Sequence, residues 1–303
     1  MVTTQTPFAS LDDYIALART GGIALSPDGR RLVAASSSLD AKGVRYTTAL
    51  WELDPDGEAP ARRLTRGAKG EGGPAFTAAG DLVFVAARPE EGEDAKPCVW
   101  RLPAAGGEAH VLTRRPGGIS GVLTARASDA VVVVADTLPG AVDEASERRL
   151  RKAREEKKVS AILHTGYPVR YWDTDLGPDA PRLFAVEGAP LPAEERDEDA
   201  SSAPSEPQTS ATLGPDDERG TRDLTPDAGK ALINGSTSLA DDGSFLVTSW
   251  QYSRGAAVHS RLVRVDVASG ERTELVSEPD ADLHAPTISP DGAWVAYAAE
   301  SLS

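Results

Sequence analysis

A short pattern recurs five times along the chain: an apolar run, a turn built on Asp-Gly or a similar pair, and a second apolar run. The clearest copies carry Ser-Pro-Asp-Gly, at residues 26–29 and 289–292. Asp-Gly provides a residue that tolerates positive φ, and a preceding Pro favours the turn. The flanking runs have the length and the Val, Ile and Phe content of strands. The pattern predicts five β-hairpins, at residues 23–35, 74–86, 119–136, 237–249 and 286–297.

A second pair of strands is predicted after most of these hairpins. Its first member alternates apolar and polar residues, as at residues 49–54 and 261–266, which is typical of half-buried strands. Each unit closes on Leu-Thr or Leu-Val, ending at residues 65, 113, 225 and 276. A four-stranded unit repeated about every fifty residues is typical of a β-propeller blade. A β-sandwich or a helical solenoid accounts less well for the repeated order.

We therefore predict an all-β fold: a β-propeller of about four and a half blades in an incomplete ring, with a short N-terminal helix and an inserted charged helix. Residues 1–22 form the helix and lead-in, and residues 23–303 form the partial propeller. The predicted blades are residues 23–65, 73–113, 118–225, 231–276 and the incomplete 285–303. The third blade contains two insertions, at residues 139–181 and 187–222.

The first helical pattern lies before the first blade, at residues 11–19. Ser10 is the candidate N-cap, and two aspartates follow in the first turn, where the positive end of the helix dipole favours them. Gly21-Gly22 comes next, and we expect these glycines to end the helix.

The second helical pattern lies in the first insertion, at residues 142–159. Glu144–Arg148 and Glu147–Arg151 have the i,i+4 spacing and orientation that stabilise a helix. The pattern predicts an exposed, charged helix. It serves either as a solvated spacer or as a docking surface for another domain.

Aromatic residues gather in the second half of this insertion, although they form only 5% of the chain. Tyr167, Arg170, Tyr171 and Trp172 lie within six residues of one another, and such residues favour interfaces and pockets. They are our candidates for contact with a substrate or with another domain. The alternative is that they pack the insertion onto its own blade.

The second insertion, residues 187–222, is rich in acidic residues, Pro, Ser and Thr. It has too few apolar residues to offset the entropy cost of ordering, so we expect most of it to be disordered. Its acidic residues lack the spacing of a calcium-binding loop, and we predict no metal site there.

Charge and composition exclude several classes of function. The net charge of −15 argues against binding to nucleic acid, whose phosphates it would repel, and against an anionic membrane. The chain contains no apolar run long enough to span a bilayer and no N-terminal signal-peptide pattern. Its single cysteine, Cys98, is expected to be a small buried residue; the absence of a possible internal disulfide favours a reducing, cytoplasmic location.

Catalytic motifs are missing from the sequence. Gly-x-Ser-x-Gly does not occur, and the nearest segment, residues 118–122, fails at its last position. The four histidines, His110, His164, His259 and His284, lack the spacing of metal ligands. We therefore predict no catalytic residue, no metal site and no cofactor in these 303 residues.

Together these features resemble a known family. Leu-Asp-Asp-Tyr-Ile at residues 11–15 leads directly into Leu-Ser-Pro-Asp-Gly, and Ser-Pro-Asp-Gly recurs at residues 289–292. Residues 166–173, Gly-Tyr-Pro-Val-Arg-Tyr-Trp-Asp, are followed by Pro-Arg-Leu-Phe-Ala at residues 181–185. The whole order is similar to the N-terminal propeller of the prolyl oligopeptidase group of serine peptidases, family S9. The resemblance is strongest to bacterial acylaminoacyl-peptidase and dipeptidyl-peptidase-like members.

The resemblance implies a function and partners. In this family a seven-bladed propeller caps a C-terminal α/β-hydrolase domain that holds a Ser-Asp-His triad, and it admits peptides but not folded proteins. No catalytic residue of the family can be transferred to a position of this sequence. The expectation is a substrate-gating propeller that is inactive alone, with a peptide substrate and a hydrolase domain as partners. The alternative is a non-enzymatic binding module of the Tol or WD40 type.

Overall fold

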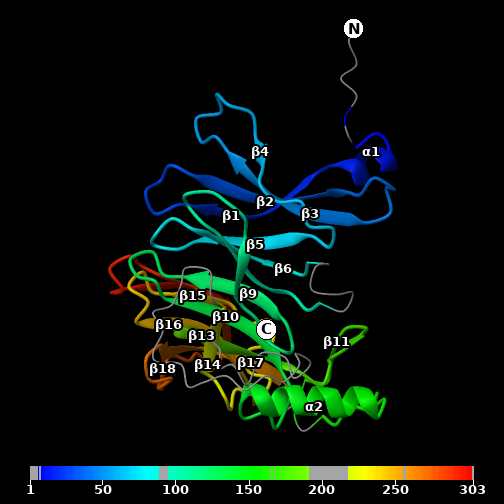
Figure 1. Cartoon of the computed structure of the whole chain (residues 1–303). Helices are drawn as coiled ribbons and strands as arrows, with labels where there is room; N and C mark the ends of the chain where they lie inside the picture. The colour runs from blue at the N-terminus through cyan, green and yellow to red at the C-terminus, as the bar shows by residue number, and fades with distance from the viewer. Residues whose placement is uncertain are drawn as a thin grey trace, which may run out of the picture.

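The computed structural model describes residues 6, 8–88, 95–164, 166, 168–190, 218–254 and 257–301. Within them, four antiparallel sheets of four strands follow each other in chain order, and a two-stranded sheet comes after them (Figure 1). A further two-stranded sheet lies in the first insertion. The predicted β-propeller architecture and all five predicted hairpins are confirmed.

Each sheet outside the insertion is one blade. The first contains β1 (Arg19–Leu25), β2 (Leu32–Leu39), β3 (Tyr46–Leu53) and β4 (Arg62–Arg63). The second contains β5 (Glu71–Phe76), β6 (Leu82–Ala86), β7 (Cys98–Leu102) and β8 (His110–Thr113). The third contains β9 (Ile119–Thr124), β10 (Val131–Thr137), β13 (Ala180–Pro190) and β14 (Arg219–Asp223). The fourth contains β15 (Thr237–Leu239), β16 (Phe245–Arg254), β17 (Ala257–Asp266) and β18 (Arg272–Val276), and the fifth contains β19 (Ala281–Ile288) and β20 (Val295–Ser301).

The hydrophobic core lies between neighbouring blades. Successive side chains of a strand point to opposite faces of its sheet, so both faces of a middle blade are apolar. In β6, Phe84 packs in the cluster shared with the first blade, and Val83 packs in the cluster shared with the third. In β10, Val133 faces the second blade and Val132 faces the fourth. This alternation is what stacks the sheets side by side.

The ring of blades is open in the described residues. The outermost strand of the fifth sheet, β20, is exposed along nearly its whole length. At the other end of the series, Ile23 and Leu25 of the first blade are 62% and 45% exposed. The faces of the first and last blades therefore have no neighbour of their own kind.

The N-terminal helix is shorter than predicted. Helix α1 spans Leu11–Ala16, and Ser10 is its N-cap, accepting a hydrogen bond from the Asp13 backbone N–H at 3.3 Å. The expectation that Gly21-Gly22 ends the helix was wrong, because residues 19–20 already pair with β2. Ladder hydrogen bonds to a neighbouring strand replace the last helical turn that the sequence pattern indicated.

The inserted helix α2 spans Glu144–Glu156, within the predicted range, but it is not exposed all round. Of the second insertion, predicted to be mostly disordered, residues 191–217 lie outside the described residues. Its two ends were predicted wrongly, since residues 187–190 continue β13 and residues 219–222 belong to β14. Pairing of these two strands extends the outer edge of the third blade.

Candidate functional site

The first insertion folds back over one face of the propeller. It consists of α2 and a small hairpin formed by β11 (Arg170–Tyr171) and β12 (Thr174–Asp175). Figure 1 shows α2 and the β11 hairpin near each other at the lower right, far from α1 at the upper right. The side chains that hold this insertion, and the cavity beneath it, form the candidate site.

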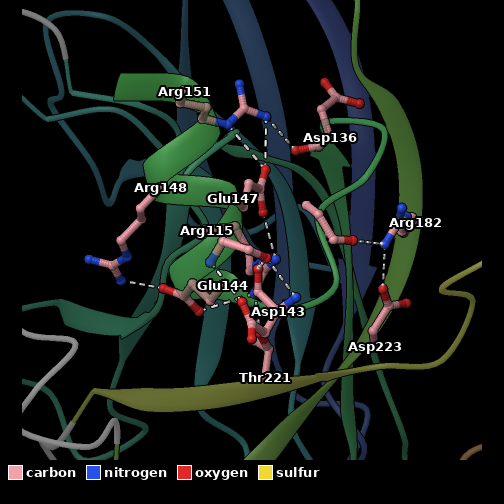
Figure 2. Close-up of polar contacts among 12 residues, drawn as sticks. Arg115, Asp136, Asp143, Glu144, Glu147, Arg148, Arg151, Arg182, Thr221 and Asp223 are labelled. Carbon is pink, nitrogen blue, oxygen red and sulfur yellow. Dashed lines mark hydrogen bonds and ion pairs between the residues drawn. The ribbon is translucent and has the colours of Figure 1, made fainter. Parts of the chain in front are cut away.

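A buried arginine fixes α2 to the propeller (Figure 2). Arg115 follows the end of β8 and donates to Glu147 Oε2 at 2.7 Å and to Glu144 Oε2 at 3.0 Å. The Arg115 and Glu147 side chains are only 5% and 0% exposed. The guanidinium also lies 4.2 Å from the Phe184 ring centroid. The expectation of an exposed, charged helix was therefore wrong at its first turn, where Arg115 pairs with two buried acids, Glu144 and Glu147.

A second arginine continues this network. Arg151 donates to Glu147 Oε1 at 2.9 Å, as the i,i+4 spacing predicted, and to Asp179 Oδ2 at 2.7 Å. The predicted Glu144–Arg148 pair is also present. Burial and the neighbouring Asp179 carboxylate raise the pKa of Asp136. The network thus attaches the helix to the third blade at several points.

The four predicted contact residues have different environments. Tyr167 lies outside the described residues. Tyr171 is half-buried, and its hydroxyl donates to Gln251 Oε1 of the fourth blade at 3.2 Å. Arg170 is exposed and pairs with Asp175 at 3.6 Å. Trp172, at the hairpin tip, is 97% exposed and has a φ of +51°, which is unusual for a large side chain.

A cavity of about 380 Å³ lies between the insertion and the fourth blade, lined by residues on either side of the hairpin. Its walls include apolar and aromatic side chains from both parts of the chain: Ile162, Leu163, Pro168, Trp250 and Tyr252. Polar and charged side chains also line it: Thr137, His164, Asp179, Arg182, Asp227 and Lys230. A cavity of this size accommodates a small ligand.

Lys230 closes one side of the cavity. Its ammonium donates to His164 Nδ1 and to the Gly166 carbonyl, each at 3.2 Å, and to the Pro168 carbonyl. Burial lowers the pKa of Lys230. No local motif in the sequence contains Lys230, Thr137 or Trp250, and their positions in one cavity depend on segments far apart in the chain.

The described residues contain no group of three or more His, Cys, Asp or Glu side chains that could hold a metal ion. Cys98 is buried in β7, as expected. In the part of the chain that the structure describes, neither helix is long and apolar enough to cross a bilayer.

Comparison with known proteins gives a sequence relative over almost the whole chain. No family model matches. Dipeptidyl-peptidase 5 of Porphyromonas endodontalis is 26% identical over 297 residues, which cover 97% of this chain and 39% of that protein. The chain resembles the β-propeller of S9-family serine peptidases. This S9-like propeller spans about two fifths of its relative's length.

Solved structures agree with the fold of the S9-like propeller. Acylaminoacyl peptidase of Pyrococcus horikoshii has a TM-score of 0.56 at 9% identity, covering 96% of this chain and 37% of that one. A putative TolB from Agrobacterium tumefaciens has a TM-score of 0.50 at 13% identity, covering 93% of this chain and 70% of that one. At such identities these similarities show the propeller fold alone.

Proposed function

We propose that this chain is the substrate-gating propeller of an S9-type peptidase and lies against an α/β-hydrolase domain. The observation that carries the proposal is the similarity to dipeptidyl-peptidase 5, which covers 97% of this chain but only 39% of the relative. Most of the relative's length is therefore available for a further domain. The proposed substrate is a peptide, and the proposed setting is cytoplasmic.

The centre of the propeller supports a gating role. The innermost strands β1, β5, β9 and β15 line a common space of about 370 Å³, and its lining includes Ile23, Phe76, Val122 and Leu239. Such a space has the size of a small-ligand pocket and is far smaller than a folded domain. A propeller that caps a hydrolase would in this way admit short, extended peptides and exclude folded proteins.

The topology supports a contact between the first insertion and the proposed hydrolase domain. Strands alternate in direction within each blade. The start of β1 and the ends of β10 and β20 therefore lie at the same face of the propeller. The insertion with α2 and the β11–β12 hairpin leaves from the end of β10. In the proposal, the exposed Trp172 and Arg170 of that hairpin contact the hydrolase domain.

The first test is the reading frame that follows codon 303. The proposal expects it to encode Gly-x-Ser-x-Gly followed by Asp and His. The 303-residue chain alone is expected to show no turnover of aminoacyl-nitroanilides and no labelling by a fluorophosphonate. Labelling of this chain, or a downstream frame without these motifs, would contradict the proposal.

The gating role has its own test in the complete polypeptide. Ile23→Trp narrows the central space, and Val44→Trp is the matched control, because Val44 is 76% exposed and lies outside that lining. We expect Ile23→Trp to lower kcat/KM for a ten-residue peptide at least fivefold while a dipeptidyl-nitroanilide is affected less. Equal effects of the two variants would exclude gating through this space.

The second candidate is a non-enzymatic binding module, and the TolB similarity favours it, because this chain covers 70% of that protein. This candidate expects no hydrolase motif downstream of codon 303. The reading frame therefore distinguishes the two functions.

A further inference from the structure

We propose that the cavity between the first insertion and the fourth blade binds a small molecule through its carboxylate, with Thr137 and His164 as the hydrogen-bond donors. The proposal concerns a site away from the central space of the propeller, and it does not depend on the presence of a hydrolase domain.

The first observation is an unpaired hydroxyl at the edge of the cavity. Thr137 is 3% exposed, and its Oγ1 has no hydrogen-bond partner. Leaving a buried hydroxyl unpaired destabilises a fold, and such groups are rare in folded proteins. Thr137 lines the cavity, so a ligand acceptor placed there would satisfy its O–H.

The second observation is the orientation of the His164 ring. The Lys230 ammonium has three N–H groups, and its three acceptors are His164 Nδ1 and two backbone carbonyls. Because Nδ1 accepts, the ring hydrogen of a neutral His164 is on Nε2. None of the described residues accepts from Nε2, and His164 lines the cavity, so this N–H is available to a ligand.

The third observation is the charge balance of the lining. Asp179 is paired with Arg151, Asp227 is paired with Arg272, and Arg182 is paired with Asp223. Lys230 instead bonds to neutral acceptors, and no carboxylate among the described residues pairs with it. A chain of net charge −15 thus holds an unmatched positive charge beside the cavity, which favours an anionic ligand.

The walls define the rest of the ligand. Trp250 and Tyr252 are half-buried in the lining, and each ring has an arginine over it, Arg272 at 5.1 Å and Arg261 at 5.3 Å. The parts of these rings that line the cavity suit an apolar or aromatic group. A carboxylate that accepts from both Thr137 and His164, with an apolar group against these rings, matches the cavity. The C-terminus of a short peptide and a free aromatic carboxylic acid share this chemistry.

Calorimetric titration of the full chain tests the proposal with three probes: the dipeptide Ala-Phe, its amide Ala-Phe-NH₂, and 3-phenylpropionate. We expect at least one carboxylate to bind ten times more tightly than the amide. Stronger binding of Ala-Phe identifies a peptide terminus as the source, and stronger binding of 3-phenylpropionate identifies a free acid. Amide binding within threefold of both acids, or no binding of any probe at 10 mM, would overturn the proposal.

Substitutions test whether the carboxylate binds in this cavity. Thr137→Val keeps the shape and removes the hydroxyl, and His164→Leu removes the ring N–H without supplying another donor. Each is expected to weaken binding of the carboxylate at least fivefold and to leave binding of the amide unchanged. The matched controls are Thr287→Val and His284→Leu, at exposed positions of β19. Because His164→Leu also removes the contact with Lys230, Thr137→Val is the decisive variant. Unchanged binding of the carboxylate by the Thr137→Val variant would contradict the proposal.

Discussion

Arg115 and Glu147 form an ion pair of 2.7 Å that is almost fully buried, although Glu147 belongs to a helix with a highly charged sequence. The pair joins the end of the second blade to an insertion of the third. Removing one partner of such a pair leaves a buried charge without compensation and typically costs about 3–5 kcal/mol.

We therefore predict that Glu147→Gln lowers the free energy of unfolding by about 3 kcal/mol or more. Glu156→Gln, at an exposed position of the same helix, is the control and should change it by less than about 0.5 kcal/mol. Urea unfolding followed by circular dichroism measures both. Similar small effects of the two variants would mean that the Arg115 network does not anchor α2.

Two glycines in hairpin turns provide a matched pair of substitutions that tests how closely neighbouring blades pack. Gly29 and Gly243 have φ angles of +73° and +76°, but a Cβ on Gly29 meets nothing within 4 Å. A Cβ on Gly243 would lie 2.4 Å from Ala130 Cβ. Gly29→Ala is expected to cost about 1–2 kcal/mol from backbone strain, and Gly243→Ala a further 1–3 kcal/mol or so from overpacking. Equal losses in urea unfolding would contradict the contact between the third and fourth blades.

Thr137→Val is expected to raise the free energy of unfolding by about 1 kcal/mol, because it removes a buried hydroxyl without a partner and keeps the side-chain volume. Thermal melting compares it with Thr113→Val, whose buried hydroxyl donates to the Arg219 carbonyl at 2.8 Å. That control should be destabilised. A loss of stability in Thr137→Val would show that its hydroxyl already has a partner in solution.

The raised pKa of Asp136 predicts that the free energy of unfolding depends on pH. Its pKa is raised above the ordinary value of 3.8, so the native protein holds this proton to a higher pH than the unfolded chain. Stability from this group is therefore present at low pH and is lost as the pH rises from about 4 through the raised pKa. Asp136→Asn should equal the parent protein near pH 4 and exceed it at pH 7, by less than about 1 kcal/mol because the group is partly solvated. If urea unfolding shows a difference in free energy between the two proteins that does not change with pH, the raised pKa of Asp136 is not its cause.

Trp172→Gly tests the role of the hairpin tip. The left-handed backbone of Trp172 is strained for a large side chain, and its indole is 97% exposed. We expect the variant to keep or increase the free energy of unfolding, by up to about 1 kcal/mol. In the complete polypeptide we expect it to weaken contact with the hydrolase domain, measured as faster proteolysis between the domains. Clear destabilisation of the 303-residue chain would mean instead that Trp172 packs within its own blade.

The blade architecture was predictable because its signals are local. An Asp-Gly turn between two apolar runs favours a hairpin, and the alternation of apolar and polar residues indicates which strand faces are buried. The Glu144–Arg148 and Glu147–Arg151 pairs were predictable for the same reason, since helical spacing alone brings them together. The end of α1 was missed because pairing of β1 with β2 overrides a local helical preference.

Local patterns were enough to predict the four-stranded repeat and the place of the insertions, because turn chemistry and periodicity act over a few residues. Packing in three dimensions is what brings Arg115 onto the buried Glu144 and Glu147 of α2, and what brings Thr137, His164 and Lys230 to the border of one cavity. These residues come from separate segments. Their contacts depend on how the insertion packs against the third and fourth blades, which no local pattern specifies.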